Sequence, residues 1–94
     1  MYIVYLNYVR PLEEVEAVLD PHVAWLNKYF DAGVFITAGR KDPRTGGVLI
    51  VKDIDRERLN TILAEDPFQA VAEYEVTKVN VTRSAEEFQS LVGI

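Results

Sequence analysis

The chain has 94 residues, the length of one domain, and 49% of them are hydrophobic, so it can bury a core of its own. Its formal net charge of −5 argues against duplex nucleic acid as a partner, because such binding needs clustered Lys and Arg. Since the sequence has no cysteine, it excludes disulfides, thiolate nucleophiles and cysteine-based metal or iron–sulfur sites. No apolar run approaches the roughly 20 residues of a membrane span, and no signal-peptide pattern is present, so we expect a cytoplasmic protein with no membrane partner.

Residues 2–9 are rich in β-branched and aromatic side chains, which predicts a first strand. Both faces of this strand carry apolar residues, which indicates that each face is covered, one of them by a partner subunit. Arg10 and Pro11 end the strand, because proline cannot donate to a β-ladder. Residues 12–19 then show the apolar spacing of a short helix.

The strongest helix signal follows at residues 20–33. Asp20 is the predicted N-cap and Pro21 the first helical residue, where its missing N–H costs nothing. The predicted apolar stripe consists of Val23, Leu26 and Phe30, with either Trp25 or Tyr29. Gly33 is expected to take a left-handed conformation after the last turn. His22, the only histidine, then lies in the first turn, among backbone N–H groups without helical partners.

The second half of the chain predicts two strands, a helix and a further strand. Residues 34–38 and 48–52 most simply form a hairpin with a polar tip at residues 40–47. Residues 54–65 predict a helix with Asp55 as its cap, and residues 68–72 form either a further helical turn or a loop. Residues 74–81 alternate strictly and predict the fourth strand. Ser84 and Glu87 fit a capping box at the start of a last helix.

The order β-α-β-β-α-β predicts an α+β protein of the ferredoxin-like, split βαβ type. In this fold a four-stranded antiparallel sheet has its helices on one face. We expect a single domain over residues 1–94, with a core of residues 1–82 and an extra C-terminal helix in residues 83–94. The uncovered sheet face would carry aromatic and aliphatic side chains. Because exposed patches of this kind usually mark interfaces, we expect a homodimer.

Several short stretches together resemble the YciI-like (YCII-related) family of the dimeric α+β barrel superfamily. They are Asp20–Leu26, Gly33–Gly39, Pro43–Gly47, Asp66–Phe68 and Ala72–Val76, and the likeness covers residues 1 to about 82. The chain departs from many relatives at residues 37–40, where Arg40 replaces the proline of a Ser-Gly-Pro motif. The resemblance implies a dimeric ferredoxin-like fold with a pocket centred on a histidine and an aspartate. Some members are associated with lyase or dehalogenation chemistry on hydroxylated aromatics, and the wider group includes isomerases and cofactor-free oxygenases.

His22 is the candidate acid–base residue, because histidine changes its charge near physiological pH more readily than other side chains. The helix N-terminus favours a neutral ring. A carboxylate on one ring nitrogen would fix the tautomer and leave the other nitrogen free to accept a proton. On the resemblance, Asp66 is that carboxylate. The alternatives are a structural histidine at the helix start and an aspartate that only caps the turn before Pro67.

The candidate substrate-binding residues are Thr37, Gly39, Arg40 and Phe68. Thr37 could donate a hydrogen bond or be an ordinary strand residue, and Gly39 comes from the stretch that carries the resemblance. Arg40 could bind a carboxylate or phenolate by charge-assisted hydrogen bonds, or be a solvated loop residue. Phe68 could stack on a flat apolar substrate or pack in the core.

The sequence therefore predicts a small cofactor-free enzyme without a metal site. His22 and Asp66 would catalyse a lyase, isomerase or dehalogenating step on a small cyclic or hydroxylated aromatic metabolite. A metal site would need more than one histidine or clustered carboxylates, and no nucleotide-binding glycine motif follows a strand. The alternative is a non-enzymatic ligand-binding or dimerisation module.

Overall fold

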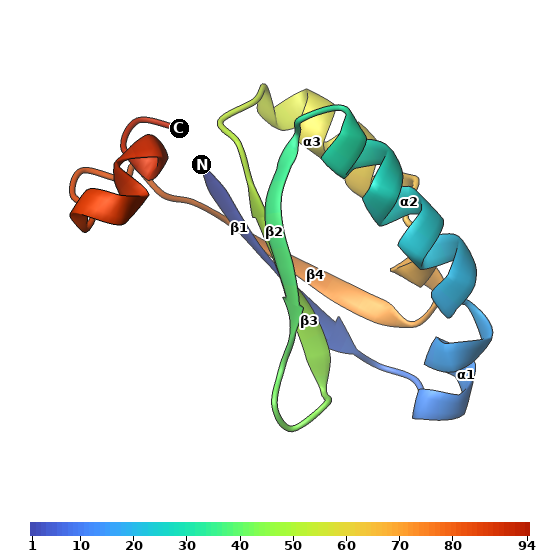
Figure 1. The fold of residues 1–94 in the computed structure, drawn as a ribbon. Helices are drawn as coiled ribbons and strands as arrows, with labels where there is room; N and C mark the ends of the chain where they lie inside the picture. Colours follow the sequence, from blue (N-terminus) through green and yellow to red (C-terminus); the bar gives the residue numbers. More distant parts are fainter.

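The computed structural model describes residues 1–94 and contains one four-stranded antiparallel sheet, covered by helices on one face (Figure 1). In chain order the elements are β1 (Tyr2–Tyr8), α1 (Leu12–Ala17), α2 (Leu19–Asp31), β2 (Phe35–Arg40), β3 (Gly46–Val51), α3 (Arg56–Ala64), the 3₁₀ helix η1 (Pro67–Ala70), β4 (Ala72–Lys78) and the 3₁₀ helix η2 (Glu86–Leu91). The strand order is β2-β3-β1-β4. The predicted ferredoxin-like α+β fold is therefore confirmed.

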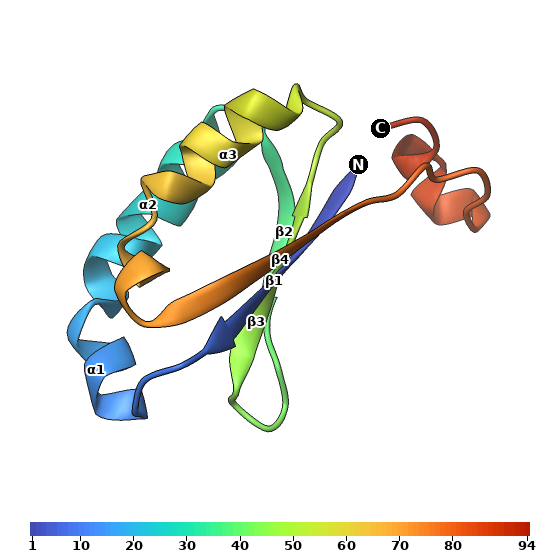
Figure 2. The ribbon, with the colours of Figure 1, turned by 180° about the vertical axis from the view of Figure 1, so that it is seen from behind.

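Strand β1 lies in the middle of the sheet, antiparallel to both β3 and β4. Its alternate residues Tyr2, Val4 and Leu6 are buried, whereas Tyr5 is exposed on the opposite face. Helices α2 and α3 lie side by side on the buried face in both views (Figures 1 and 2). The other face carries no element of this chain. None of the helices has both the length and the apolar character that crossing a membrane requires.

The start of α2 differs from the prediction. The helix begins at Leu19, and Val18 is both the C-cap residue of α1 and the N-cap residue of α2. Asp20 is therefore inside the helix rather than its N-cap, and Pro21 is its third residue. The reason is that α1 and α2 join without a loop, so the carbonyl of Val18 accepts the backbone N–H of His22 at 3.2 Å. Proline is tolerated here because an N–H in the first turn has no helical partner.

The buried face of α2 also differs from the predicted stripe. The buried residues are His22, Trp25 and Tyr29. Val23 and Phe30, which the spacing placed in the stripe, are 42% and 37% exposed. The indole of Trp25 explains this rotation, since its Nε1 donates to the carbonyl of Ile62 in α3 at 2.9 Å. A buried indole N–H needs such a partner, and the side of α2 that faces α3 supplies it.

Strands β2 and β3 form the predicted hairpin, but β2 contains a bulge. The register shifts between Phe35 and Thr37, so that Thr37 lies opposite Ile50. Ile50 is in turn paired with Ile3 on the uncovered face of the sheet. Because one extra residue reverses the alternation of a strand, the bulge turns Thr37 away from the helices and turns Arg40 towards them.

Most other boundaries lie close to their predicted positions. Gly33 has φ 73°, the left-handed conformation predicted after the helix. Asp55 precedes α3 as its N-cap residue, although its side chain makes no capping hydrogen bond. Residues 67–70 form a 3₁₀ turn, so the helical alternative is correct there. Strand β4 begins at Ala72 and ends at Lys78, two and three residues before the predicted limits of 74 and 81.

The last helix exists, but the predicted capping box is wrong. Element η2 is a kinked 3₁₀ helix whose N-cap is Ala85, and Ser84 makes no capping hydrogen bond. It buries no residue, and Phe88 is 54% exposed. A helix this short has few backbone bonds and needs packing to persist in α form. The segment lies beyond the end of the sheet, where the amino group of Met1 donates to the carbonyl of Ile94 at 2.7 Å (Figure 1).

Candidate functional site

A pocket of about 220 Å³ lies between the first turns of α2 and the β2–β3 hairpin. Nine of its 15 lining residues are hydrophobic, and no aspartate, glutamate or lysine is among them. The side chains that bring polar chemistry to the lining are Tyr8, His22, Arg40 and Arg44. An apolar cavity of about 150 Å³ is enough for benzene. The pocket therefore suits one substituted ring with a few polar groups.

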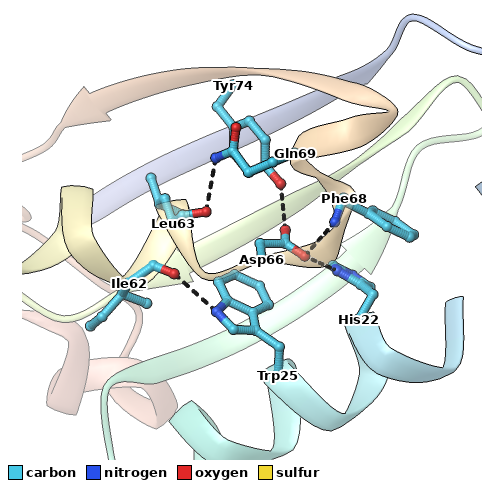
Figure 3. Close-up of polar contacts among 8 residues, drawn as sticks. All are labelled: His22, Trp25, Ile62, Leu63, Asp66, Phe68, Gln69 and Tyr74. Carbon is cyan, nitrogen blue, oxygen red and sulfur yellow. Dashed lines mark hydrogen bonds and ion pairs between the residues drawn. The ribbon is translucent and has the colours of Figure 1, made fainter. Parts of the chain in front are cut away.

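His22 and Asp66 are 44 residues apart in the chain and meet at this pocket. Nδ1 of His22 lies 2.6 Å from Oδ1 of Asp66 (Figure 3). The side chain of Asp66 is 0% exposed and that of His22 is 11% exposed. His22 lines the pocket and Asp66 does not, so the imidazole stands between the buried carboxylate and the pocket.

The carboxylate of Asp66 is held by two further donors. Its Oδ1 also accepts the backbone N–H of Phe68 at 2.9 Å, and its Oδ2 accepts the hydroxyl of Tyr74 at 2.5 Å (Figure 3). Burial raises the pKa of Tyr74, and its hydrogen bond to Asp66 raises it further, so the hydroxyl keeps its proton and donates. Asp66 therefore caps η1 and contacts the imidazole at the same time. Because an ionised carboxylate only accepts hydrogen bonds, this set of donors suits its charged form.

Two aromatic rings hold the plane of the imidazole. Phe68 stacks on His22 with ring centroids 3.6 Å apart and an interplanar angle of 4°. Trp25 lies on the same ring at 5.6 Å and 29°. Nε2 of His22 makes no hydrogen bond within the protein and is not among the fully buried polar atoms without a partner, so solvent reaches it from the pocket. The arrangement provides one accessible ring nitrogen with a buried carboxylate behind it.

The other sequence candidates fall into two groups. Gly39, Arg40 and Phe68 line the pocket with His22. Thr37 is exposed on the uncovered sheet face and is not part of the lining, because the bulge in β2 reverses the direction of its side chain. The structure therefore does not bring Thr37 to the other candidates. Phe68 stacks on the imidazole and is itself only 3% exposed, so it combines core packing with a position at the pocket wall.

Sequence reasoning did not single out Tyr74 or Arg44. Tyr74 could have been suspected, because it lies on the helix-facing side of β4 and a buried tyrosine hydroxyl usually needs a partner. Arg44 has no local signal, since only the folded hairpin brings it beside α1. There its Nη1 lies 3.0 Å from Oε1 of Glu16. No group of three or more histidine, aspartate or glutamate side chains is clustered as a metal site would require.

Comparisons with known proteins identify a family and a similar solved structure. The family model of the YCII-related domain matches residues 1–83. A search of curated proteins gives no match. Among solved structures, the chain is similar to 5-chloro-2-hydroxyhydroquinone dehydrochlorinase (TftG) from Burkholderia phenoliruptrix AC1100, solved in complex with 2,5-dihydroxybenzoquinone. The two share 19% identity with a TM-score of 0.67, and the match covers 84% of this chain and 93% of the other. At this identity the likeness establishes a common fold.

Proposed function

Since the chain belongs to the YCII-related domain family, we propose that it is a small cofactor-free enzyme with a His–Asp acid–base pair. Its substrate is a small cyclic or hydroxylated aromatic metabolite, and its reaction is a lyase, isomerase or dehalogenating step. The observation that carries this proposal is the 2.6 Å contact between Nδ1 of His22 and the buried carboxylate of Asp66 at the pocket. The similar structure is named a dehydrochlorinase and holds a dihydroxybenzoquinone, which supports a hydroxylated ring as the substrate class.

In the proposed reaction, His22 is the residue that accepts and returns the proton. The Nδ1–H group donates to Asp66, which leaves the lone pair on Nε2, at the pocket. Nε2 then removes a proton from a substrate hydroxyl or ring carbon. The positive charge that forms on the imidazole is balanced by the carboxylate, which needs no reorganisation because its three hydrogen bonds already hold it.

The fate of the electron pair decides the reaction type. In a dehalogenating or lyase step, the pair left by the proton forms a new double bond and expels a leaving group such as chloride. In an isomerase step, the imidazolium returns the proton to another substrate atom. Both need one mobile proton and no redox change in the protein, which suits a site with a single imidazole.

The test uses the full chain with a panel of small hydroxylated aromatics that includes 5-chloro-2-hydroxyhydroquinone. Chloride release and exchange of substrate hydrogens with D2O, followed by NMR, both report proton transfer. We expect activity on at least one member, and we expect His22→Ala to lower kcat by about 100- to 10,000-fold with an unchanged circular dichroism spectrum. Asn27→Ala, on the exposed side of α2, is the control.

Two outcomes would contradict the proposal. If His22→Ala kept the wild-type rate, the imidazole would have no part in the chemistry. If the wild-type protein bound a panel member in the pocket but changed none of them, the non-enzymatic ligand-binding module would be the better description.

We further propose that the protein acts as a homodimer joined through the uncovered face of its sheet. On the two central strands, Ile3 lies opposite Ile50 and Tyr5 opposite Val48. These two cross-strand pairs form a contiguous apolar patch, which is the kind of surface that a second copy of the chain would cover. The cytoplasmic location stays a prediction.

A further inference from the structure

The pocket contains two positive charges that the His–Asp chemistry does not use. Arg40 and Arg44 both line it, and no acidic side chain does. The carboxylate of Asp66 is fully buried behind His22, and Glu16, which pairs with Arg44, is not part of the lining. This positive lining stands out in a chain with 10 basic and 15 acidic residues and a net charge of −5. An anionic ligand would therefore be attracted to this part of the surface and repelled by most of the remainder.

The guanidinium of Arg44 is only partly satisfied by the protein. A guanidinium offers five N–H donors, and Arg44 uses one Nη1 group for Glu16 at 3.0 Å. Its Nε is fully buried and has no hydrogen-bond partner within the protein. A buried N–H without an acceptor is unfavourable, and a guanidinium can donate to two oxygens of a carboxylate at once. Arg44 lines the pocket and its side chain is 29% exposed, so further N–H groups of its guanidinium remain for an oxyanion there.

Arg40 reaches the same pocket because of the bulge in β2. Its partner across the hairpin is Gly47, which has no side chain to cover it. The guanidinium of Arg40 makes no hydrogen bond or ion pair within the chain, so its charge is free to act on a ligand. Two arginines on one rim favour a planar anion over a neutral ring.

We propose that Arg44, assisted by Arg40, binds an oxyanion on the ring of the ligand, either a carboxylate or an ionised phenol. This inference rests on the proposed function for the identity of the pocket and adds a substrate class to it. The substrates are aromatic acids or phenolates, held by the arginines while His22 Nε2 contacts the ring or its hydroxyl groups.

The test measures binding without chemistry. The ¹⁵N-labelled full chain is titrated with 4-hydroxybenzoate, with 4-nitrophenolate and with the neutral 4-hydroxybenzamide, and Kd is taken from the shifts of the pocket amides Gly39, Gly46 and Gly47. We expect at least one anion to bind at least tenfold more tightly than the amide. The anion with the lower Kd shows whether the arginines prefer a carboxylate or an ionised phenol. Arg44→Gln should remove this preference. Arg58→Gln, the same charge change on an exposed residue of α3, should keep it.

A second variant separates recognition from a structural effect of the ion pair. Glu16→Gln removes the negative charge of the Arg44–Glu16 ion pair but leaves the arginine in place. We expect it to keep or increase the preference for the anion, because it removes a competing carboxylate. Loss of the preference in Glu16→Gln, equal binding of anion and amide, or no pocket shift with any probe at millimolar concentration would each overturn the inference.

These results are independent of the proton-transfer test. His22→Ala removes the proposed base but leaves both arginines, so it should retain the preference for the anion even where turnover is lost. If the wild-type protein catalysed no reaction, the titration would still decide whether the arginines bind an anion.

Discussion

The rings of His22 and Phe68 lie face to face, 3.6 Å apart and within 4° of parallel. The backbone N–H of the same phenylalanine donates to the carboxylate oxygen that contacts His22. The short segment from Asp66 to Phe68 therefore restrains the imidazole in two directions, by a hydrogen bond in the ring plane and by stacking across it. This orientation leaves Nε2 as the ring atom that a ligand in the pocket can reach.

Replacement of Phe68 by alanine should destabilise the protein strongly. Phe68 is buried and stacks on His22, and the loss of a buried phenylalanine typically lowers the free energy of unfolding by about 3–5 kcal/mol. Phe88→Ala is the matched control, because Phe88 is exposed in η2, and its effect should stay within about 0.5 kcal/mol. Urea denaturation measures both. Equal effects would show that the stack contributes no more than a surface ring.

Tyr74→Phe should remove a hydrogen bond to a charged group. At pH 7 we expect a loss of about 1.5–3 kcal/mol in the free energy of unfolding, measured by urea denaturation. Tyr5→Phe is the control, since no hydrogen bond of the Tyr5 hydroxyl occurs within the chain, and it should change stability by less than about 0.5 kcal/mol.

The stability difference between the wild type and Tyr74→Phe should also depend on pH. Burial raises the pKa of Tyr74 far above its ordinary value of 10.0, so above pH 10 this tyrosine ionises in the unfolded chain but not in the folded one. The contribution of Tyr74 is therefore fully present below pH 10 and is lost as the pH rises further. Phenylalanine has no proton to lose, so the stability gap between wild type and Tyr74→Phe should narrow above pH 10. A constant gap would contradict this.

Glu65→Gln should lower the stability of the protein at neutral pH but not in acid. Hydrogen bonds from Tyr29 and then Lys28 lower the pKa of Glu65, so the folded state favours the ionised carboxylate. The resulting stabilisation is present above the ordinary value of 4.5 and disappears as the pH falls through the lowered value. Melting temperatures of wild type and variant should differ at pH 7 and converge in acid. Glu87→Gln in η2 should match the wild type throughout.

The proposed dimer can be tested by sedimentation at micromolar concentration. We expect a species of twice the 10.7 kDa chain mass for the wild type. Ile50→Glu places a charge in the centre of the uncovered face and should give the monomer with an unchanged circular dichroism spectrum. Leu12→Glu, an exposed apolar residue of α1 on the other side of the molecule, should leave the dimer intact. A wild-type protein that sediments only at 10.7 kDa would contradict the proposal.

The sequence by itself determined the order and type of the main elements. Alternation in residues 2–9 and 74–81 predicted strands, the helical spacing before Gly33 predicted α2, and proline and glycine marked the turns between them. These signals are local, because the period of a pattern reflects the geometry of its own backbone. The likeness to the family then identified His22 and Asp66 as partners, which neither residue indicates alone.

Only the tertiary structure decided which face each element buries and which side chains meet. The indole of Trp25 turns α2 towards the carbonyl of Ile62, and one bulged residue in β2 moves Thr37 away from the pocket while it brings Arg40 to it. Arg44 reaches the pocket only because the hairpin folds beside α1. A periodic pattern specifies directions relative to its own axis, whereas contacts between distant segments determine how that axis is rotated and where its register shifts.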